Sequence, residues 1–419
     1  MVKVKSSGAL FIMPRSSEAW YGAEALWITV AGWAAAAEMK YGKAWIATTD
    51  RVASPQEVLH YPIVKGERKV DLTKTKWYSG IIPTVFKTGI KDWLLYRRQP
   101  VKWPLENDGD WNKPGSDIKF VWEQHDLFPG PGQRIAESLN VPFIIYVHAP
   151  VVWELEKWGV KRPIWGKYLE QHVEASSLKK ADLVACVSEE VRSKVIEMGV
   201  SPAKVYVSPM AADSLLFLPK TKDKELVSRY KLDGKLVVGW TGSFRSFHGL
   251  DIVVKAFSQL QRKIEHACLL LVGEGSEKAK IEALVNELSL QDSVVFAGKQ
   301  AFADIPDYVS VFDVALVSAK SAEGFHYSPL KLREYLAAGK ATIAPNAGEI
   351  PIKYQDNENV LLYEAGSVDD LYNKMYRLIS DEDFRLKLKS GAISKSQESG
   401  TWVHELDRTI SKIEVLSKN

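Results

Sequence analysis

The chain has 419 residues, which is too long for one ordinary hydrophobic core and fits two domains of roughly 200 residues each. Its content of 46% hydrophobic and 26% charged residues is typical of a globular protein and excludes a disordered chain or a fibrous repeat. The formal net charge of +3 and the absence of a recognised reading motif give no support to nucleic-acid binding.

In the first half, short apolar runs alternate with helical patterns. The uncharged run 25–37 is too short to span a bilayer and lacks the basic leader of a secretory signal, so it predicts a buried helix. Runs rich in β-branched residues predict six strands. These strands are 10–13, 44–48, 118–121, 143–147, 183–187 and 205–208.

The segment 84–103 combines apolar and basic residues. Residues 65–102 hold ten Lys/Arg against three Asp/Glu, a local excess of +7. Apolar residues at Phe86, Ile90 and Trp93 with basic neighbours suit an interfacial helix on an anionic membrane, and a core-facing helix with a solvated basic face is equally consistent. Twelve of the fourteen tryptophans lie in the first 165 residues, where they could present aromatic faces to an acceptor or fill cores.

The second half alternates strand and helix patterns every 20 to 30 residues, which is typical of a parallel, doubly wound sheet. The predicted helices include 250–260 and 278–288. The predicted strands, apolar on both faces, are 236–240, 268–272, 294–296, 314–317, 342–344 and 360–362.

We therefore predict an α/β protein with two Rossmann-like, doubly wound domains that face each other across a cleft. The expected divisions are an acceptor-binding domain 1–213, a donor-binding domain 214–396, and a C-terminal helix 397–419 that returns towards the first domain. Cys186 and Cys268 both lie in strand-like runs, which indicates no disulfide framework and favours the cytoplasm.

The segment 325–339 carries the sharpest local pattern. Ser328 is a typical N-cap, Pro329 fits the first helical position, and Gly339 ends the helix about three turns later. Because this helix follows the strand 314–317, we expect its N-terminus to lie at the carboxyl edge of the sheet.

The start of this helix is a candidate phosphate site. The backbone N–H groups of Leu330 and Lys331, the helix dipole and the charge of Lys331 together favour a pyrophosphate. Glu334 can accept hydrogen bonds from a pair of ribose hydroxyls. A well-capped core helix with an exposed Lys and Glu is the alternative.

A second candidate is the loop 241–249, which joins the first strand of this half to its first helix. Gly242 allows the backbone to approach a ligand, and Arg245 and His248 would bring donors to the same pyrophosphate. Lys299 follows another strand, where nearby backbone groups could read a base edge; a tight turn is the alternative.

These residues resemble the large family of retaining glycosyltransferases of GT-B fold, group 1 or family four, which includes exopolysaccharide, mannosyl and glucosyl transferases. In the second half the matching residues are Gly242, Ser243, Phe244, Arg245, His248, Gly249 and the stretches 272–275, 328–332, 334–340 and 348–350. In the first half they are 123–128, 147–150, Glu154, 181–184 and 187–188.

The resemblance implies transfer from a nucleotide-diphosphate sugar to a saccharide or lipid-linked acceptor, with retention and without metal or cofactor. It implies that Glu334 binds the ribose and that Lys331, Arg245 and His248 bind the phosphates. His148 would face the sugar. Independently of the resemblance, the two cysteines and the segment 84–103 predict the cytoplasm or the inner face of the membrane.

The sequence departs from the family pattern at four places. His326 stands where many members have a glutamate for the donor sugar, and His248 stands in place of a lysine. Residues 210–211 are Met-Ala instead of Asn-Gly, and Gly22 is what remains of a glycine-rich acceptor loop.

His125 and Glu154 complete the expected acceptor side. Three alternative functions stay open. The chain could be a GT-B epimerase or a phosphorylase, or a nucleotide-sugar-binding protein without catalytic activity.

Overall fold

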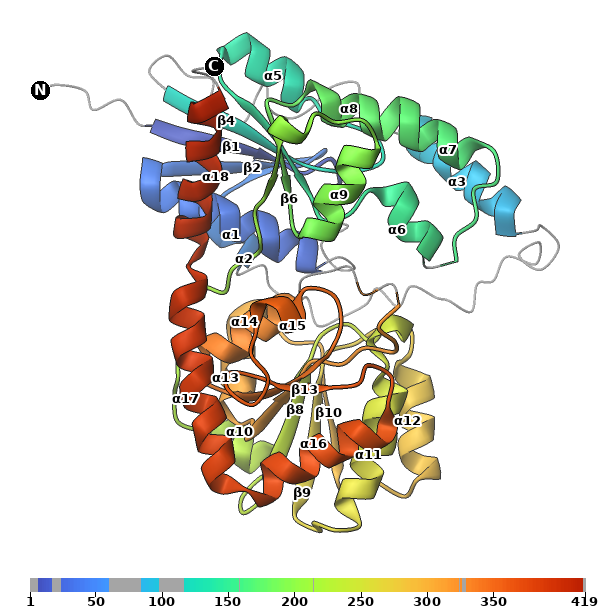
Figure 1. Cartoon of the computed structure of the whole chain (residues 1–419), viewed down its shortest axis with the longest axis vertical. Coiled ribbons are helices and arrows are strands. Elements are labelled where there is room, and N and C mark those ends of the chain that lie inside the picture. The colour runs from blue at the N-terminus through green and yellow to red at the C-terminus, as the bar shows by residue number, and fades with distance from the viewer. Residues whose placement is uncertain are drawn as a thin grey trace, which may run out of the picture. The chain divides into compact units, whose positions relative to one another are not determined.

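The structure is a computed structural model that describes residues 7–16, 24–59, 84–97, 117–157, 159–213, 215–323, 325 and 329–416. The chain divides into two compact units, which Figure 1 shows as two sheets with their helices. The N-terminal unit comprises Met1–Pro209 with Val403–Asn419, and the C-terminal unit comprises Met210–Trp402. None of the described helices has the length and apolar content needed to cross a bilayer.

The N-terminal unit contains a seven-stranded sheet in the order β3-β2-β1-β4-β5-β6-β7. All neighbouring strands are parallel except β2 and β3. The six predicted strands are confirmed, whereas β3 was missed because two residues are too few to show a periodicity. The strands are β1 (Ser7–Ile12), β2 (Lys43–Ala47), β3 (Val52–Ala53), β4 (Asp117–Gln124), β5 (Phe143–Val147), β6 (Leu183–Cys186) and β7 (Val205–Val207).

Helices connect the strands of the N-terminal unit. The uncharged run 25–37 lies in a helix whose Trp33 is fully buried, as predicted. The described helices are α1 (Glu24–Tyr41), α2 (Pro55–Leu59), α3 (Thr84–Arg97), α5 (Gly132–Leu139), α6 (Val151–Lys157), α7 (Trp165–Tyr168), the π-helix η4 (Leu169–Glu174), α8 (Ala175–Lys180), α9 (Glu189–Glu197), the 3₁₀ turn η5 (Pro202–Lys204) and α18 (Trp402–Leu416), which belongs to this unit from Val403 onwards.

The C-terminal unit contains a fully parallel six-stranded sheet in the order β10-β9-β8-β11-β12-β13. All six predicted strands are confirmed. They are β8 (Leu236–Thr241), β9 (Ala267–Val272), β10 (Val294–Gly298), β11 (Val314–Leu316), β12 (Ala341–Pro345) and β13 (Leu361–Tyr363).

Two hydrophobic clusters cover the two faces of this sheet. In β9, Leu269 and Leu271 face one cluster, while Cys268 and Leu270 face the other. A strand buried on both faces must be apolar at every position, which is why the sequence shows continuous runs here. The described helices are α10 (Lys224–Arg229), α11 (Leu250–Gln261), α12 (Lys278–Glu287), α13 (Ile305–Ser310), α14 (Leu330–Ala337), α15 (Ile350–Lys353), α16 (Val368–Ser380) and α17 (Glu382–Ser399), with 3₁₀ turns η6 (Ser246–His248) and η7 (Phe302–Asp304).

In both sheets the strand order reverses once, beside the first strand. The reversal lies between β1 and β4 in one sheet and between β8 and β11 in the other. At such a switch point the two following connections diverge to opposite faces, which leaves room for a ligand at the carboxyl ends of the strands. In the C-terminal sheet these connections are the loop 242–249 and the segment 317–329, so both predicted phosphate-binding elements lie at the switch point.

Candidate functional site

At the switch point of the C-terminal sheet, hydrogen bonds join the end of β8 to the segment after β11 and to helix α14. The Trp240 indole N–H donates to Ser318 Oγ at 3.0 Å. The Thr241 backbone N–H donates to the Tyr335 hydroxyl at 2.8 Å, and Thr241 Oγ1 lies 2.9 Å from the same oxygen. Trp240 and Tyr335 are both fully buried. The end of β8 is therefore fixed both to the segment after β11 and to helix α14.

Helix α14 begins one residue later than the sequence predicted. Pro329, in an extended conformation, is the N-cap, so Leu330 is the first helical residue, and the predicted N-cap Ser328 lies outside the described residues. A proline side chain offers no acceptor to cap the first turn, which leaves that task to other groups or a ligand. The C-terminal end is as predicted, because Gly339 follows the helix at a φ of +65°.

Lys331 places a buried ammonium at this switch point. Its Nζ lies 4.0 Å from the centre of the Trp240 ring, which provides a cation–π contact. Within the described residues, Nζ has no hydrogen-bond partner and no contact with solvent. Burial lowers the pKa of Lys331 to about 7, although the nearby Glu334 opposes this shift.

Gly242 allows this ammonium to approach the loop after β8. A Cβ atom at Gly242 would lie 2.7 Å from Lys331 Nζ, and the residue has a φ of +144°. A side chain there would therefore displace Lys331, and the positive φ would in addition strain the backbone. The loop and the helix therefore meet at one point, where the Lys331 ammonium faces the half-buried backbone of Gly242.

Glu334 is the second buried ionisable group of α14. Glu334 is 6% exposed, and burial raises the pKa of its carboxyl to about 8; Lys331 opposes this rise and Asp213 adds to it. A carboxyl with this pKa is largely protonated at neutral pH, so it can both donate and accept hydrogen bonds. That suits a pair of hydroxyl groups on a ligand.

The loop 242–249 brings two further predicted residues to the same place. His248 is buried, and its pKa lies well below the ordinary value, first because of burial and then because of the charges of Lys331 and Arg245. One cation from helix α14 and one from the loop 242–249 therefore act on the same imidazole. His248 is neutral at physiological pH, and Arg245 is exposed.

The remaining predicted donor residues have different placements. Ser243 is half-buried beside Gly242, and Leu330 opens helix α14. Lys299 is half-buried just after β10, the edge strand of the sheet, which is two strands away from β8. The predicted donor residue His326 lies outside the described residues.

In the N-terminal unit, His148 follows β5 at the carboxyl edge of the sheet. Its ring packs edge-on against Tyr146 with 5.2 Å between centroids. Burial, with a contribution from the charge of Arg15, lowers the pKa of His148 to about 3, so the imidazole is neutral. Among the described residues, its Nε2 has no hydrogen-bond partner.

An ion pair spans the N-terminal switch point. Arg15 follows β1, Asp126 follows β4, and Arg15 Nε lies 2.5 Å from Asp126 Oδ2. Neither residue was predicted as a site residue, although Asp126 lies in the matching stretch 123–128. The signal that could have found them is their position, since each comes within three residues of the end of a strand at the point where strand order reverses.

The expected acceptor residues are not gathered in one described cluster. His125 Nε2 lies 3.0 Å from the buried Glu174 Oε1, and Glu174 also accepts the backbone N–H groups at the start of α6 from Val151 and Val152. His125 thus belongs to a buried network that caps a helix. Glu154 lies in the first turn of α6. Gly22, the third expected acceptor residue, lies outside the described residues.

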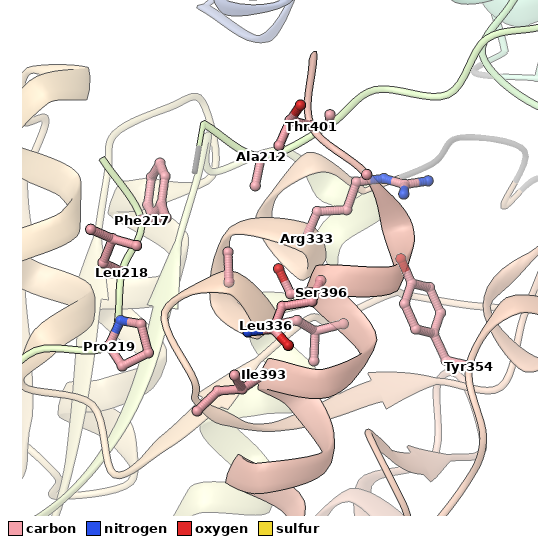
Figure 2. A pocket seen from close by; sticks show the side chains of 14 residues that line it. Ala212, Phe217, Leu218, Pro219, Arg333, Leu336, Tyr354, Ile393, Ser396 and Thr401 are labelled. Atoms are coloured by element: carbon pink, nitrogen blue, oxygen red, sulfur yellow. The ribbon is translucent and has the colours of Figure 1, made fainter. Parts of the chain in front are cut away.

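A separate pocket of about 340 Å³ lies on another side of α14 (Figure 2). Arg333 and Leu336 of α14 line it, together with Phe217 and Ile393. Figure 2 shows the Phe217 side chain opposite Leu336 and Ile393. Neither Lys331 nor Glu334 lines this pocket, so it is distinct from the switch-point site.

Comparison with known proteins identifies the fold and then the family. Over 97% of this chain and 99% of the other, the structure is similar to Anabaena HepE in complex with UDP and glucose, with a TM-score of 0.64 and 15% identity. The structure is also similar to a sucrose-phosphate synthase of Thermosynechococcus elongatus, with a TM-score of 0.61 and 16% identity. This match covers 98% of this chain and 99% of the synthase. The two doubly wound units define the GT-B class of fold, as predicted.

The family follows from the sequence matches. Residues 235–381 match the family described as Glycosyl transferases group 1, and residues 116–214 match Glycosyltransferase Family 4. The chain belongs to the group 1 glycosyltransferases, which confirms the resemblance.

Individual relatives match only part of the chain. A GDP-mannose-dependent α-(1-6)-phosphatidylinositol monomannoside mannosyltransferase of Mycobacterium tuberculosis is 26% identical over 53% of this chain and 58% of its own length. An N-acetyl-α-D-glucosaminyl L-malate synthase of Bacillus anthracis is 27% identical over 49% of this chain and 52% of its own length. The chain thus spans little more than half the length of these relatives.

Proposed function

We propose that this protein transfers a sugar from a nucleotide-diphosphate donor to a saccharide or lipid-linked acceptor, with retention of configuration and without a metal or cofactor. The observation that carries the proposal is the buried Lys331 ammonium beside Gly242, which has no hydrogen-bond partner among the described residues. A buried cation without an anion is costly, and a diphosphate at this point would supply the missing charge.

The chemistry follows from the charges at the switch point. As the glycosidic bond breaks, the leaving nucleotide diphosphate gathers negative charge, which Lys331, Arg245 and the first amides of α14 would stabilise. Loss of one such donor costs about 3 to 4 kcal/mol, or roughly 10²- to 10³-fold in rate. His248, being neutral, would contribute a hydrogen bond and no charge. Glu334 would hold the ribose hydroxyls.

The acceptor proton would leave through the departing phosphate, as the family resemblance implies, so that no protein base is needed. His148 would then act as a neutral hydrogen-bonding group towards the sugar, since its pKa of about 3 keeps it uncharged. The N-terminal unit is the proposed acceptor side. The proposed compartment is the cytoplasm, in keeping with the free and buried thiols of Cys186 and Cys268.

Donor binding and turnover test this proposal directly. We expect thermal stabilisation by at least one of UDP, GDP and ADP or their sugars, because a ligand that binds the folded state raises Tm. Lys331→Ala and Glu334→Ala should each abolish most donor turnover while the protein stays folded. Unchanged kinetics in either variant would remove the donor assignment.

The same assay separates the alternative functions. An epimerase would convert the donor sugar without an acceptor, and a phosphorylase would require phosphate. A binding protein without activity would be stabilised by nucleotide and release none from a nucleotide sugar. Acceptor-dependent release of the nucleoside diphosphate is the result that supports transfer.

A further inference from the structure

Helix α3 presents large apolar side chains outward. Phe86, Ile90 and Trp93 are 66%, 51% and 54% exposed, and Leu94 beside them is also exposed. Spacings of three and four residues place these side chains along one face of the helix. Side chains of this size are normally buried, so a contiguous exposed set indicates a surface that meets something other than water.

The segment around α7 packs against α3 and carries further exposed apolar side chains. Asp92 of α3 accepts hydrogen bonds from Arg162 at 2.7 and 2.9 Å and from the Trp165 indole at 3.0 Å, so the two segments are fixed to each other. Figure 1 shows α3 and α7 side by side. Ile164 is 87% exposed, and Tyr168 is exposed as well.

We call residues 84–97 and 159–168 together the α3–α7 surface. Seven of the fourteen large hydrophobic residues that are exposed in the described part of the chain belong to it. This concentration in two short segments distinguishes the surface from singly scattered apolar residues, which need no explanation.

The charge of this surface has one sign. Lys91, Lys161 and Lys167 are exposed. The two segments contain a single acidic residue, Asp92, which is 5% exposed and forms an ion pair with Arg162. The acid is therefore neutralised inside the unit, and only cations accompany the apolar side chains outward.

We propose that the α3–α7 surface docks on a lipid bilayer that contains anionic lipids. Aromatic and aliphatic side chains flanked by lysines are the composition of interfacial helices, whose cations meet lipid phosphates while the apolar groups enter the boundary of the hydrocarbon. Protein interfaces, by contrast, are depleted of lysine. The proposal goes beyond donor chemistry and is tested without nucleotide.

The experiment is sedimentation of the full chain with vesicles of phosphatidylcholine, with or without 30% phosphatidylglycerol. We expect binding to the anionic vesicles that weakens as salt rises, and little binding to the neutral ones. The variant Ile90→Ser with Lys91→Glu should lower the affinity roughly tenfold or more, because a reversed charge and a lost apolar contact act together.

A matched control changes an equivalent pair elsewhere. Leu386 is 52% exposed and is followed by the exposed Lys387, so Leu386→Ser with Lys387→Glu removes the same chemistry from α17. This control should bind vesicles like the wild type. Equal losses in both variants, or equal binding to neutral and anionic vesicles, would overturn the proposal.

Hydrogen exchange gives a readout that needs no variant. Vesicles should slow amide exchange within 84–97 and 159–168, and unchanged exchange there on vesicle-bound protein would also contradict docking through this surface. Circular dichroism and thermal unfolding confirm that the variants are folded. Failure of vesicle binding leaves donor turnover unaffected, so the two proposals fail separately.

Discussion

Replacement of Lys331 by Met should stabilise the empty protein while it removes donor binding. Burial lowers the pKa of Lys331 from 10.5 to about 7. That difference corresponds to about 4 to 5 kcal/mol of cost for the charged form in the folded state. The contact with Trp240 returns about 1 to 2 kcal/mol, and Met retains the packing of the aliphatic chain.

The net expectation is a gain of about 3 kcal/mol in the free energy of unfolding at pH 7, or about 6 to 12 °C in Tm for a unit of this size. The sign follows from proton linkage, because the unfolded state binds more protons between pH 7 and 10.5 and wild-type stability therefore rises with pH there. The advantage of Met should be largest at or below pH 7 and shrink towards pH 10.

Chemical denaturation at pH 6, 7 and 9 measures the stability, and calorimetric titration with nucleotide sugars measures the binding. Lys340 supplies the control, because its buried ammonium donates to the backbone carbonyls of Ser310 and Phe312 at 2.8 and 3.1 Å. Burial lowers the pKa of Lys340 as well, to about 8, but Lys340→Met leaves both acceptors without a donor, so it should stabilise the protein much less than Lys331→Met or lower its stability. If Lys331→Met lowers stability in the same way, the ammonium is already satisfied and the reasoning about an anion site is refuted.

Two further predictions concern the geometry of the site, and one concerns its pH dependence. Tyr335→Phe keeps the ring but leaves the Thr241 N–H without its acceptor, so stability should fall by about 1 to 3 kcal/mol and donor affinity several-fold; unchanged titrations would contradict this role. Gly242→Ala should weaken donor binding at least tenfold, because the new Cβ displaces Lys331. The control is Gly234→Ala, which also has a positive φ, +68°, but nothing within 4 Å of the new Cβ, so it should cost backbone strain alone. Equal effects of the two variants on donor affinity would refute the steric argument. Nucleotide-sugar affinity should fall by up to about tenfold per pH unit above pH 7, since binding favours protonated Lys331; a flat profile from pH 6 to 9 would show that no proton is taken up.

The fold was predictable from the sequence because its strands are buried on both faces. The run 268–272 has no polar position, as its alternate residues face two separate clusters. Strand β3 was not predicted, because an antiparallel edge strand of two residues is too short to show a hydrophobic pattern. The start of α14 was misplaced by one residue, because Ser328 followed by Pro329 fits the usual N-cap and first helical positions, whereas Pro329 itself is the N-cap.

The candidate site was predictable where it is charged and not where it is apolar. Lys331 and Arg245 stand out because they follow strands, whereas Trp240 and Tyr335 look like ordinary core residues in the sequence. Only the structure shows that the indole lies under an ammonium and that the phenol binds the neighbouring loop. A side chain that supports a site through packing and one hydrogen bond has no sequence signature of its own.

The two buried groups of α14 also explain why charge should decide which ligands bind. With pKa values of about 7 and 8, Lys331 is half protonated and Glu334 mostly protonated in the empty site at neutral pH. In the proposed site, a diphosphate would restore the full charge of Lys331, and part of its binding free energy would be used for that protonation. A nucleoside or a free sugar cannot recharge the ammonium, and it leaves the burial cost in place. Discrimination in favour of diphosphates should therefore depend on the charge of Lys331 and should weaken as the pH rises above 7.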